Sequence, residues 1–251
     1  MIDTHAHILN EYYDDIDKVI NNMKDNIIII SGTNDSDNIE VIKLCNKYKN
    51  VYGTIGIHPE EIDNMTSDSY KIIEENLSNP KIVGIGEIGL DYHYTKDNKE
   101  KQKEVFINQL NLAKKYNKPV VVHSRDAIAD TYEILKKYKE LKKDIHCFSG
   151  SLEMAKEFIK INCRLGIGGV LTFKNSKLSE VIKQLPIDSF LLETDSPFLT
   201  PEPFRGDKNE PYNIIYVAKK IAEIKGISLE EVLEITKNNA ICQFDLDKKM
   251  C

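Results

Sequence analysis

Short β-rich runs alternate with amphipathic helical stretches from one end of this 251-residue chain to the other. Several of the runs are continuous stretches of Val, Ile, Leu and Gly, a pattern typical of parallel strands that helices cover. No Pro/Gly/Ser-rich linker or block of charge divides the series, so we expect one domain over residues 1–251. The eight expected strands are Met1–His7, Asn26–Gly32, Val51–Ile57, Lys81–Gly89, Pro119–His123, Asp144–Ser149, Cys163–Leu171 and Ser189–Asp195.

The stretches between the strands have helical spacing. In Asn98–Tyr116, Val105 and Leu112 lie on one apolar face, and Ser228 followed by Glu231 forms a capping box at the start of the last helix. Eight β–α repeats in this length predict an α/β fold of the TIM (β/α)8 barrel type, whose usual size is ~250 residues. A doubly wound open sheet is the alternative, but no Gly-rich phosphate-binding fingerprint follows an early strand.

Composition excludes several classes of protein. The isoleucine run Ile27–Ile30, like every other apolar run in the chain, is far shorter than the ~20 residues of a membrane helix, and no secretory signal is visible, so we expect a cytoplasmic protein without a membrane span. Five cysteines without a C-x-x-C pair argue for reduced thiols rather than disulfides or a thiolate zinc site. A net charge of −6 disfavours a broad basic surface for duplex nucleic acid, although it permits a local phosphate contact.

Polar side chains gather where the expected strands end. His5 and His7 are two residues apart on the first strand, so both point to the same face. Glu87 and Asp195 each follow a strongly apolar run, and a buried carboxylate there needs a partner. The remaining two histidines at strand ends are His123 and His146.

Any one of these six residues could be a structural histidine or carboxylate, but four imidazoles and two carboxylates at one end of a barrel predict a nitrogen/oxygen metal site. They are too many for one tetrahedral ion with an open position. Two metals ~3.5–4 Å apart, bridged by a carboxylate and a water, use them all. Mg, Mn, Co and Zn are all compatible with this ligand set.

Several motifs, in this order, give the chain a resemblance to the TatD-like metal-dependent hydrolases, known as the TatD DNase family. They are IDTHAHIL at residues 2–9, GIHPE at 56–60, IGEIGLDY at 85–92, VVVHSRDA at 120–127, HCFSGS at 146–151 and LLETDSPFLTPEPFRGDKNEP at 191–211.

The resemblance implies a barrel related to the amidohydrolases and divalent-metal-dependent DNase activity from the 3′ end, with two ions. It places His5, His7, Glu87 and Asp195 around one metal and Glu87, His123 and His146 around the second. The implied partner is DNA, as single strands or 3′ ends, without an obligate protein partner. We expect Asp195 to act as general base and Glu87 to bridge the metals.

Three residues outside the ligand set are expected to bind substrate: His58, Arg125 and Arg205. His58 could instead make a hydrogen bond at the rim of the barrel. Arg125 could form a salt bridge with Asp126 or Asp130, and Arg205 could fix the loop in which it lies.

Other side chains near the site have supporting roles. Glu193 shares a face with Asp195 and is expected to orient a metal-bound histidine or water, with a buried lysine as the alternative partner. Strand alternation predicts that Cys147 points away from the metals. Aromatic rings such as Tyr92, Tyr94 or Phe204 could stack on unpaired bases.

Two rival functions stay open. An amidohydrolase-like enzyme could hydrolyse a small amide, ester or lactone, or an aminoacyl-tRNA ester, because the same metals polarise a carbonyl. The other rival is a non-catalytic metal-binding or scaffold protein, although the complete ligand set argues against it.

Overall fold

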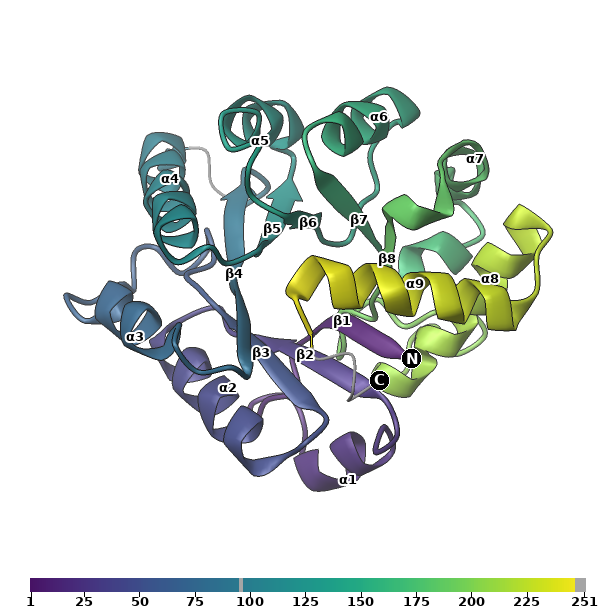
Figure 1. The fold of residues 1–251 in the computed structure, drawn as a ribbon, viewed down its shortest axis with the longest axis horizontal. Helices are drawn as coiled ribbons and strands as arrows, with labels where there is room; N and C mark the ends of the chain where they lie inside the picture. The colour runs from purple at the N-terminus through teal and green to yellow at the C-terminus, as the bar shows by residue number, and fades with distance from the viewer. Residues whose placement is uncertain (95–96, 247–251) are drawn as a thin grey trace.

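The computed structural model describes residues 1–94 and 97–246. Its eight strands form one parallel sheet in the order β1 to β8, with helices around the outside (Figure 1). The elements are β1 Ile2–Ala6, α1 Ile16–Asn21, β2 Ile27–Ser31, α2 Asp35–Lys47, β3 Val51–Ile55, α3 Ser69–Asn76, β4 Ile82–Asp91, α4 Lys99–Tyr116, β5 Val120–Arg125, α5 Ile128–Leu135, β6 Lys143–Ile145, α6 Leu152–Lys160, β7 Cys163–Ile167, η1 Gly169–Thr172, α7 Leu178–Gln184, η2 Ile187–Ser189, β8 Phe190–Leu192, η3 Pro211–Asn213, α8 Ile214–Lys225 and α9 Leu229–Phe244.

The sheet closes between its first and last strands. Ala6 and Ser196 form an isolated parallel bridge, and the N–H of Asp195 donates to the carbonyl of His5 at 2.9 Å. This closure makes the fold a TIM barrel, as the repeat pattern predicted, and not an open sheet.

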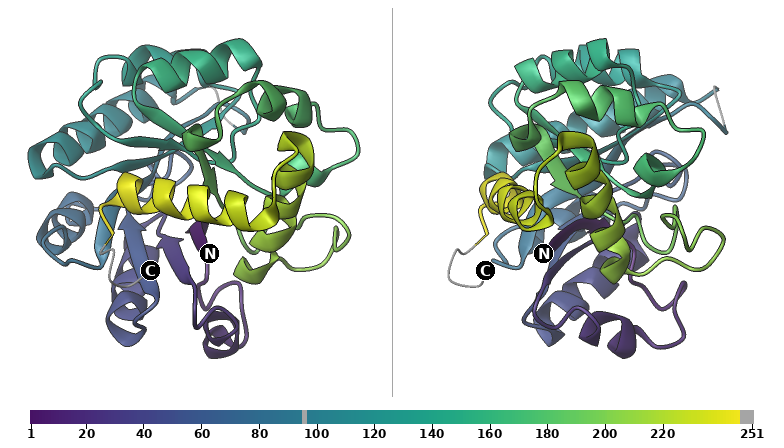
Figure 2. Two further views of the ribbon diagram at one scale, coloured as in Figure 1. Left: turned by 45° about the vertical axis from the view of Figure 1, so that its right-hand side comes forward. Right: turned by 90° about the vertical axis from the view of Figure 1, so that its right-hand side faces the viewer.

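Helix α9 covers one end of the barrel. Ile241 and Phe244 of this helix pack in one buried cluster with Ile29, Val121 and Leu191, which lie on β2, β5 and β8. Figure 2 shows α9 beside the N-terminus, at the end where the strands begin, while long loops extend from the opposite end. The open end is therefore the one at which the strands finish, where TIM barrels carry their sites.

The predicted helix signals are present in the fold. Ser228 caps α9 by accepting a hydrogen bond from the N–H of Glu231 at 3.1 Å, and α4 buries the predicted face that contains Val105. No helix in the two described ranges is both long enough and apolar enough to cross a membrane.

The expected strands run past the observed C-terminal ends by one or two residues in β1, β2 and β3 and by three or four residues in β6, β7 and β8. β6 ends at Ile145, β7 at Ile167 and β8 at Leu192, so His146 and Asp195 lie on the turns that follow and not on strands. The backbone turns away from the ladder at residues with positive φ, 48° at Cys147 and 56° at Asp195.

Candidate metal centre

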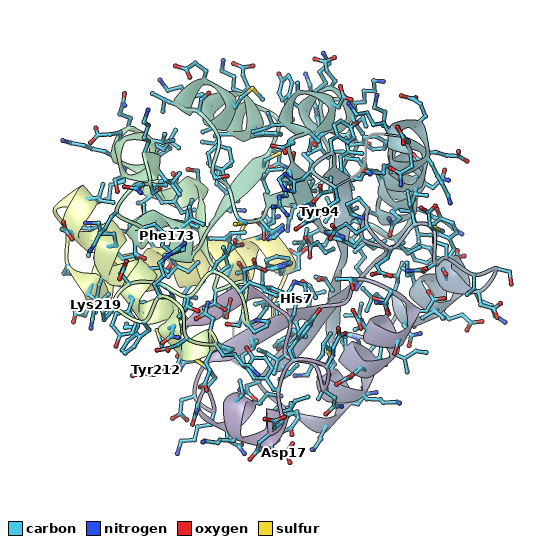
Figure 3. The ribbon with its side chains drawn as sticks, turned by 180° about the vertical axis from the view of Figure 1, so that it is seen from behind. His7, Asp17, Tyr94, Phe173, Tyr212 and Lys219 are labelled. Atoms are coloured by element: carbon cyan, nitrogen blue, oxygen red, sulfur yellow. The ribbon has the colours of Figure 1, made fainter. Side chains whose placement is uncertain are left out.

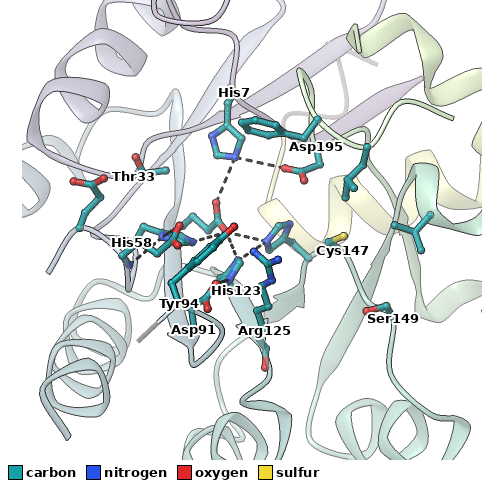
Figure 4. Close-up of a pocket in the computed structure, with 18 of the residues that line it drawn as sticks. His7, Thr33, His58, Asp91, Tyr94, His123, Arg125, Cys147, Ser149 and Asp195 are labelled. Atoms are coloured by element: carbon teal, nitrogen blue, oxygen red, sulfur yellow. Dashed lines mark hydrogen bonds and ion pairs between the residues drawn. The ribbon is translucent and has the colours of Figure 1, made fainter. Parts of the chain in front are cut away.

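A pocket of about 580 Å³ opens at the C-terminal ends of the strands. Seen from behind in Figure 3, His7 lies near the middle of this face, with Tyr94 toward one side. The six expected ligands all converge here, and Figure 4 shows His7 and Asp195 on one side of the pocket with His58 and His123 on the other. The converging residues are His5, His7, Glu87, His123, His146 and Asp195.

One group of donors lies around Oε2 of Glu87. The Nε2 atoms of His5 and His7 are 3.1 Å apart, and each is 3.4 Å from this oxygen. Each is also 3.6 Å from Oδ1 of Asp195. Four ligands at about 2.0–2.2 Å from a tetrahedral Zn²⁺ would be about 3.3–3.6 Å from one another. The donor set therefore fits a divalent cation in both chemistry and spacing.

A second group lies around the other oxygen of the same carboxylate. Oε1 of Glu87 is 2.8 Å from Nδ1 of His123 and 2.8 Å from Nε2 of His146. The two imidazole nitrogens are 3.2 Å apart. Glu87 thus presents one oxygen to each group, which is the arrangement that a bridging carboxylate requires.

The outer nitrogens of three imidazoles are held by hydrogen bonds. Nδ1 of His7 donates to the carbonyl of Ser31 at 3.0 Å, and Nδ1 of His5 lies 3.1 Å from the hydroxyl of the same serine. Nε2 of His123 lies 2.9 Å from the carboxylate of Asp91. Metal-binding histidines commonly hydrogen-bond a carboxylate or carbonyl in this way, which fixes the ring with its other nitrogen inward.

Ser31 and Asp91 were missed by the sequence analysis, although each carries a signal. Ser31 is the polar end of a strand of four isoleucines, and Asp91 lies four residues after Glu87 on β4, hence on the same face.

Two irregularities in the sheet aim the central residues. The β1–β2 register shifts between Asp3 and Ala6, on either side of His5. The β4–β5 register shifts between Ile85 and Ile88, on either side of Glu87. Bulges of this kind redirect side chains next to functional sites.

The carboxylates of the site are ionised. Burial opposes the charge of Glu87, but nearby His146, His58 and His5 outweigh it and hold its pKa well below the ordinary value. Burial likewise opposes the charge of Asp195, and the hydrogen bond from His7 together with neighbouring imidazoles lowers its pKa.

Two imidazoles balance this negative charge with protons. Burial disfavours protonated His7, yet hydrogen bonds to Asp195 and Glu87 raise its pKa to about 10. Burial also opposes charge on His123, and hydrogen bonds to Asp91 and Glu87 raise its pKa to about 9. In contrast, burial and the neighbouring His146 lower the pKa of His5 to about 4.

His58 also reaches the pocket. Its Nε2 lies 3.4 Å from Oε1 of Glu87, while its Nδ1 accepts a hydrogen bond from the N–H of Glu60 at 3.2 Å. Because the Nδ1 lone pair is used, the proton of neutral His58 is on Nε2, facing the pocket. The ring is therefore a hydrogen-bond donor to whatever occupies the pocket.

The two arginines differ. Arg125 lines the pocket, and its guanidinium lies 4.9 Å from the ring centroid of Tyr94. The aspartates considered as its alternative partners bind elsewhere, Asp126 to His93 at 2.9 Å and Asp130 to Lys103 at 3.0 Å.

The expected substrate contact of Arg205 is not supported. Its guanidinium lies 3.5 Å from the ring centroid of Phe173, and Arg205 does not line the pocket. This contact fits the alternative in which Arg205 fixes its own loop.

Glu193 is a fully buried acid next to His146 and Cys147. Its Oε1 accepts a hydrogen bond from the backbone N–H of Cys147 and lies 3.9 Å from Nδ1 of His146. Burial, followed by the charges of Asp144 and Asp195, raises its pKa well above the ordinary value, so the carboxyl is neutral. It holds the turn that carries His146 rather than binding the imidazole directly.

Gly166 leaves room for this carboxyl, because a Cβ there would lie 2.1 Å from Oε2 of Glu193. The basis of the prediction for Cys147 does not hold. The residue lies on the turn after β6 with a φ of 48°, where strand alternation does not apply, and it lines the pocket. Burial and nearby carboxylates raise the pKa of its thiol well above the usual range, so the thiol stays protonated.

Only one of the three suggested aromatic rings lies at the pocket. Tyr94 lines it and is 69% exposed. Tyr92 is buried with its hydroxyl donating to Asp130 at 2.8 Å, and Phe204 lies at a separate cavity. The sequence analysis overlooked Phe198, which lines the pocket beside His7 with 6.2 Å between ring centroids.

Comparisons with known proteins agree with this centre. Residues 2–245 match the family model described as TatD related DNase. The "uncharacterized metal-dependent hydrolase YabD" of Bacillus subtilis is 44% identical, over 96% of this chain and 97% of the relative. "Uncharacterized metal-dependent hydrolase YcfH" of Escherichia coli K12 is 31% identical, over 98% and 96%. The crystal structure of YJJV, a TatD homologue from E. coli K12, superposes with a TM-score of 0.89 at 29% identity, covering 98% of both chains.

The barrel, its donor groups and these relatives together define a metal-dependent hydrolase. The chain belongs to the TatD family, because the family model spans nearly its whole length.

Proposed function

We propose that the enzyme is a deoxyribonuclease that removes nucleotides from the 3′ end of single-stranded DNA with two divalent ions. The observation that carries this proposal is the position of Glu87, whose two carboxylate oxygens face two separate donor groups. The residues that would hold the ions are His5, His7, Glu87, His123, His146 and Asp195. Bound ions would polarise a phosphodiester and lower the pKa of an attacking water toward neutrality.

The chain supplies the groups that bind the ester and move the proton. Oδ1 of Asp195 faces His5 and His7, which leaves its second oxygen to accept a proton from water as general base. Nε2–H of His58 points into the pocket and can donate to a phosphate oxygen. Arg125 at the mouth offers a guanidinium to the same charged group.

The family name supports DNA as the substrate. The net charge of −6 supports binding at strand ends rather than tight binding along duplex DNA. Binding the end of a strand requires few phosphate contacts, which is compatible with the single arginine, Arg125, that lines the pocket.

One observation favours a second candidate. Glu60 and Glu61 line the pocket, where they would repel additional phosphates and attract an amine. An amidohydrolase-like enzyme acting on a small amide, ester or lactone, or on an aminoacyl-tRNA ester, would use such a rim.

A substrate panel separates the two. Chelator-stripped protein is loaded with Mg, Mn, Co or Zn and given 5′-labelled single-stranded DNA, the same DNA with a blocked 3′ end, RNA, p-nitrophenyl phosphodiesters and p-nitrophenyl esters. We expect progressive shortening of the unblocked DNA and resistance of the blocked strand. Asp195→Asn, purified in parallel, controls for a contaminating nuclease. Rapid ester hydrolysis with intact DNA would replace this proposal with the second candidate.

A further inference from the structure

A second cavity of about 500 Å³ lies beside the main pocket, between the end of α1 and the segment that leads into α8. Three aromatic rings line it. Phe204 and Tyr216 pack edge to face with 5.2 Å between centroids, while Phe204 is 39% and Tyr212 51% exposed. Large rings left this open beside a cavity offer flat faces to a ligand.

The two cavities share a wall. Lys208 lines the second cavity and donates a 2.6 Å hydrogen bond to the carbonyl of Tyr12, which lines the main pocket. The ring of Tyr12 packs edge to face on Phe198, with 5.5 Å between centroids, and Phe198 is 47% exposed beside His7. In Figure 3, Tyr212 lies to one side of His7 and Tyr94 to the other. A continuous series of side chains therefore connects the metal centre to the second cavity.

Charge restricts what could bind there. The Asp, Glu, Lys and Arg residues that line the second cavity are Asp207, Lys208 and Glu210, so acidic side chains outnumber basic ones. Such a surface does not hold a row of phosphates by cation contacts. Stacking on aromatic faces requires no cation and tolerates any base, and it is how many proteins bind single strands.

We propose that the second cavity is a subsite for unpaired nucleobases of the strand whose 3′ end occupies the main pocket. The proposal rests on the proposed function, since it names where the rest of the same substrate lies. Tyr212 and Phe204 stack on bases, and Phe198 lies on the path between the subsite and the metal centre.

The test compares a long substrate with a short one. Oligothymidylate of about 12 nucleotides can reach both cavities, whereas bis-p-nitrophenyl phosphate fits the main pocket alone. Tyr212→Ala and Phe204→Ala should each lower kcat/KM for the oligonucleotide, relative to that for the small diester, by about fivefold to a hundredfold, the effect of one lost stacking contact. Tyr212→Phe keeps the ring and should keep the wild-type ratio. Tyr116→Ala, at an exposed ring at the end of α4, should leave both rates unchanged.

Binding is measured separately, by fluorescence anisotropy of labelled oligothymidylate without divalent metal. Weaker binding by Tyr212→Ala but not by Tyr116→Ala would support the subsite even if no diester is cleaved, an outcome that would contradict only the proposed function. Equal binding and an unchanged ratio of rates in Tyr212→Ala and Phe204→Ala would overturn the subsite while leaving the nuclease proposal intact. Wild-type protein that neither binds nor cleaves the oligonucleotide would overturn both.

Discussion

Asp91 holds His123 from the side that faces away from the metal centre. Its Oδ2 lies 2.9 Å from Nε2 of the imidazole, while Nδ1 of the same ring is 2.8 Å from Glu87. Asp91 is itself fixed by Gln102 of α4, whose side chain accepts from the Asp91 N–H at 2.9 Å and donates to its carbonyl at 2.7 Å. The orientation of His123 is therefore set through a helix of the outer ring.

This contact predicts a role for Asp91 in metal affinity. Asp91→Ala should weaken divalent-ion binding by about 10- to 100-fold, as is usual for partners of metal-binding histidines. Competition with a fluorescent chelator measures it. Asp130→Ala, which removes an acid that binds Lys103 and Tyr92 outside the pocket, is the matched control. Wild-type affinity in Asp91→Ala would show that packing alone orients His123.

Glu87→Ala should lower the number of bound ions. We expect close to two ions per loaded and dialysed wild-type chain and at most one in the variant, because Glu87 presents one carboxylate oxygen to each of the two donor groups. Elemental analysis after dialysis counts them. Glu193→Gln removes a different buried acid, which is already neutral, and should keep the wild-type content. Unchanged content in Glu87→Ala would remove Glu87 from the bridge.

Metal loading should release protons. The raised pKa values of about 10 for His7 and about 9 for His123 mean that both rings are protonated in metal-free protein at neutral pH, whereas His5, at about 4, is not. His7 lies in one donor group and His123 in the other, so each bound ion must displace one of these protons and about two are released per chain near pH 7. Affinity should rise with pH up to about 9 for the His123 group and up to about 10 for the His7 group. Weakly buffered titration with a pH indicator measures the release. Arg125→Ala should give the same number, and loading without release would contradict the assignment.

The sequence predicted the barrel because hydrophobic runs and helical spacing are local properties that repeat eight times. It also predicted which side chains converge, since the two-residue period of β1 places His5 and His7 on one face. Elemental analysis of wild-type protein and Glu87→Ala tests whether these side chains bind metal.

Contacts between distant segments could not be predicted in the same way. The bond from Asp91 to His123 joins two strands, and its partners become visible only when the register is known. The strand-alternation argument for Cys147 failed for a related reason, because β6 is only three residues long and the turn after it has a positive φ. The sequence gives no local signal for such a backbone reversal at a non-glycine residue.

Asp3 should make the stability of the metal-free protein depend on pH. Burial raises its pKa from 3.8 to about 7, against hydrogen bonds from Thr194 and the backbone of His5 that lower it. A raised carboxyl pKa contributes stability that is present below the unfolded value and lost as pH rises through the folded value.

Asp3→Asn cannot ionise and keeps an oxygen that can accept from Thr194. Its free energy of unfolding, relative to wild type, should increase by up to about 4 kcal/mol between about pH 4 and pH 8. Denaturant unfolding with EDTA measures this difference, with Asp14→Asn as a control at an exposed acid. A difference independent of pH would show that Asp3 is ionised throughout this range.

Asp195→Asn should separate proton transfer from metal binding. The φ of 56° at this residue is left-handed, and Asn tolerates that conformation as Asp does, so the turn and its bond to the His5 carbonyl should persist. The amide keeps one oxygen toward His5 and His7 but cannot accept the proton of an attacking water. We expect kcat to fall by about 10²–10⁴-fold, the usual contribution of a positioned acid–base group, with much of the metal retained. Metal content and kcat are measured on the same preparation, with Glu193→Gln in parallel. A variant with full metal and a near-wild-type rate would exclude Asp195 as the base, and a low rate with lost metal would assign it to metal binding alone.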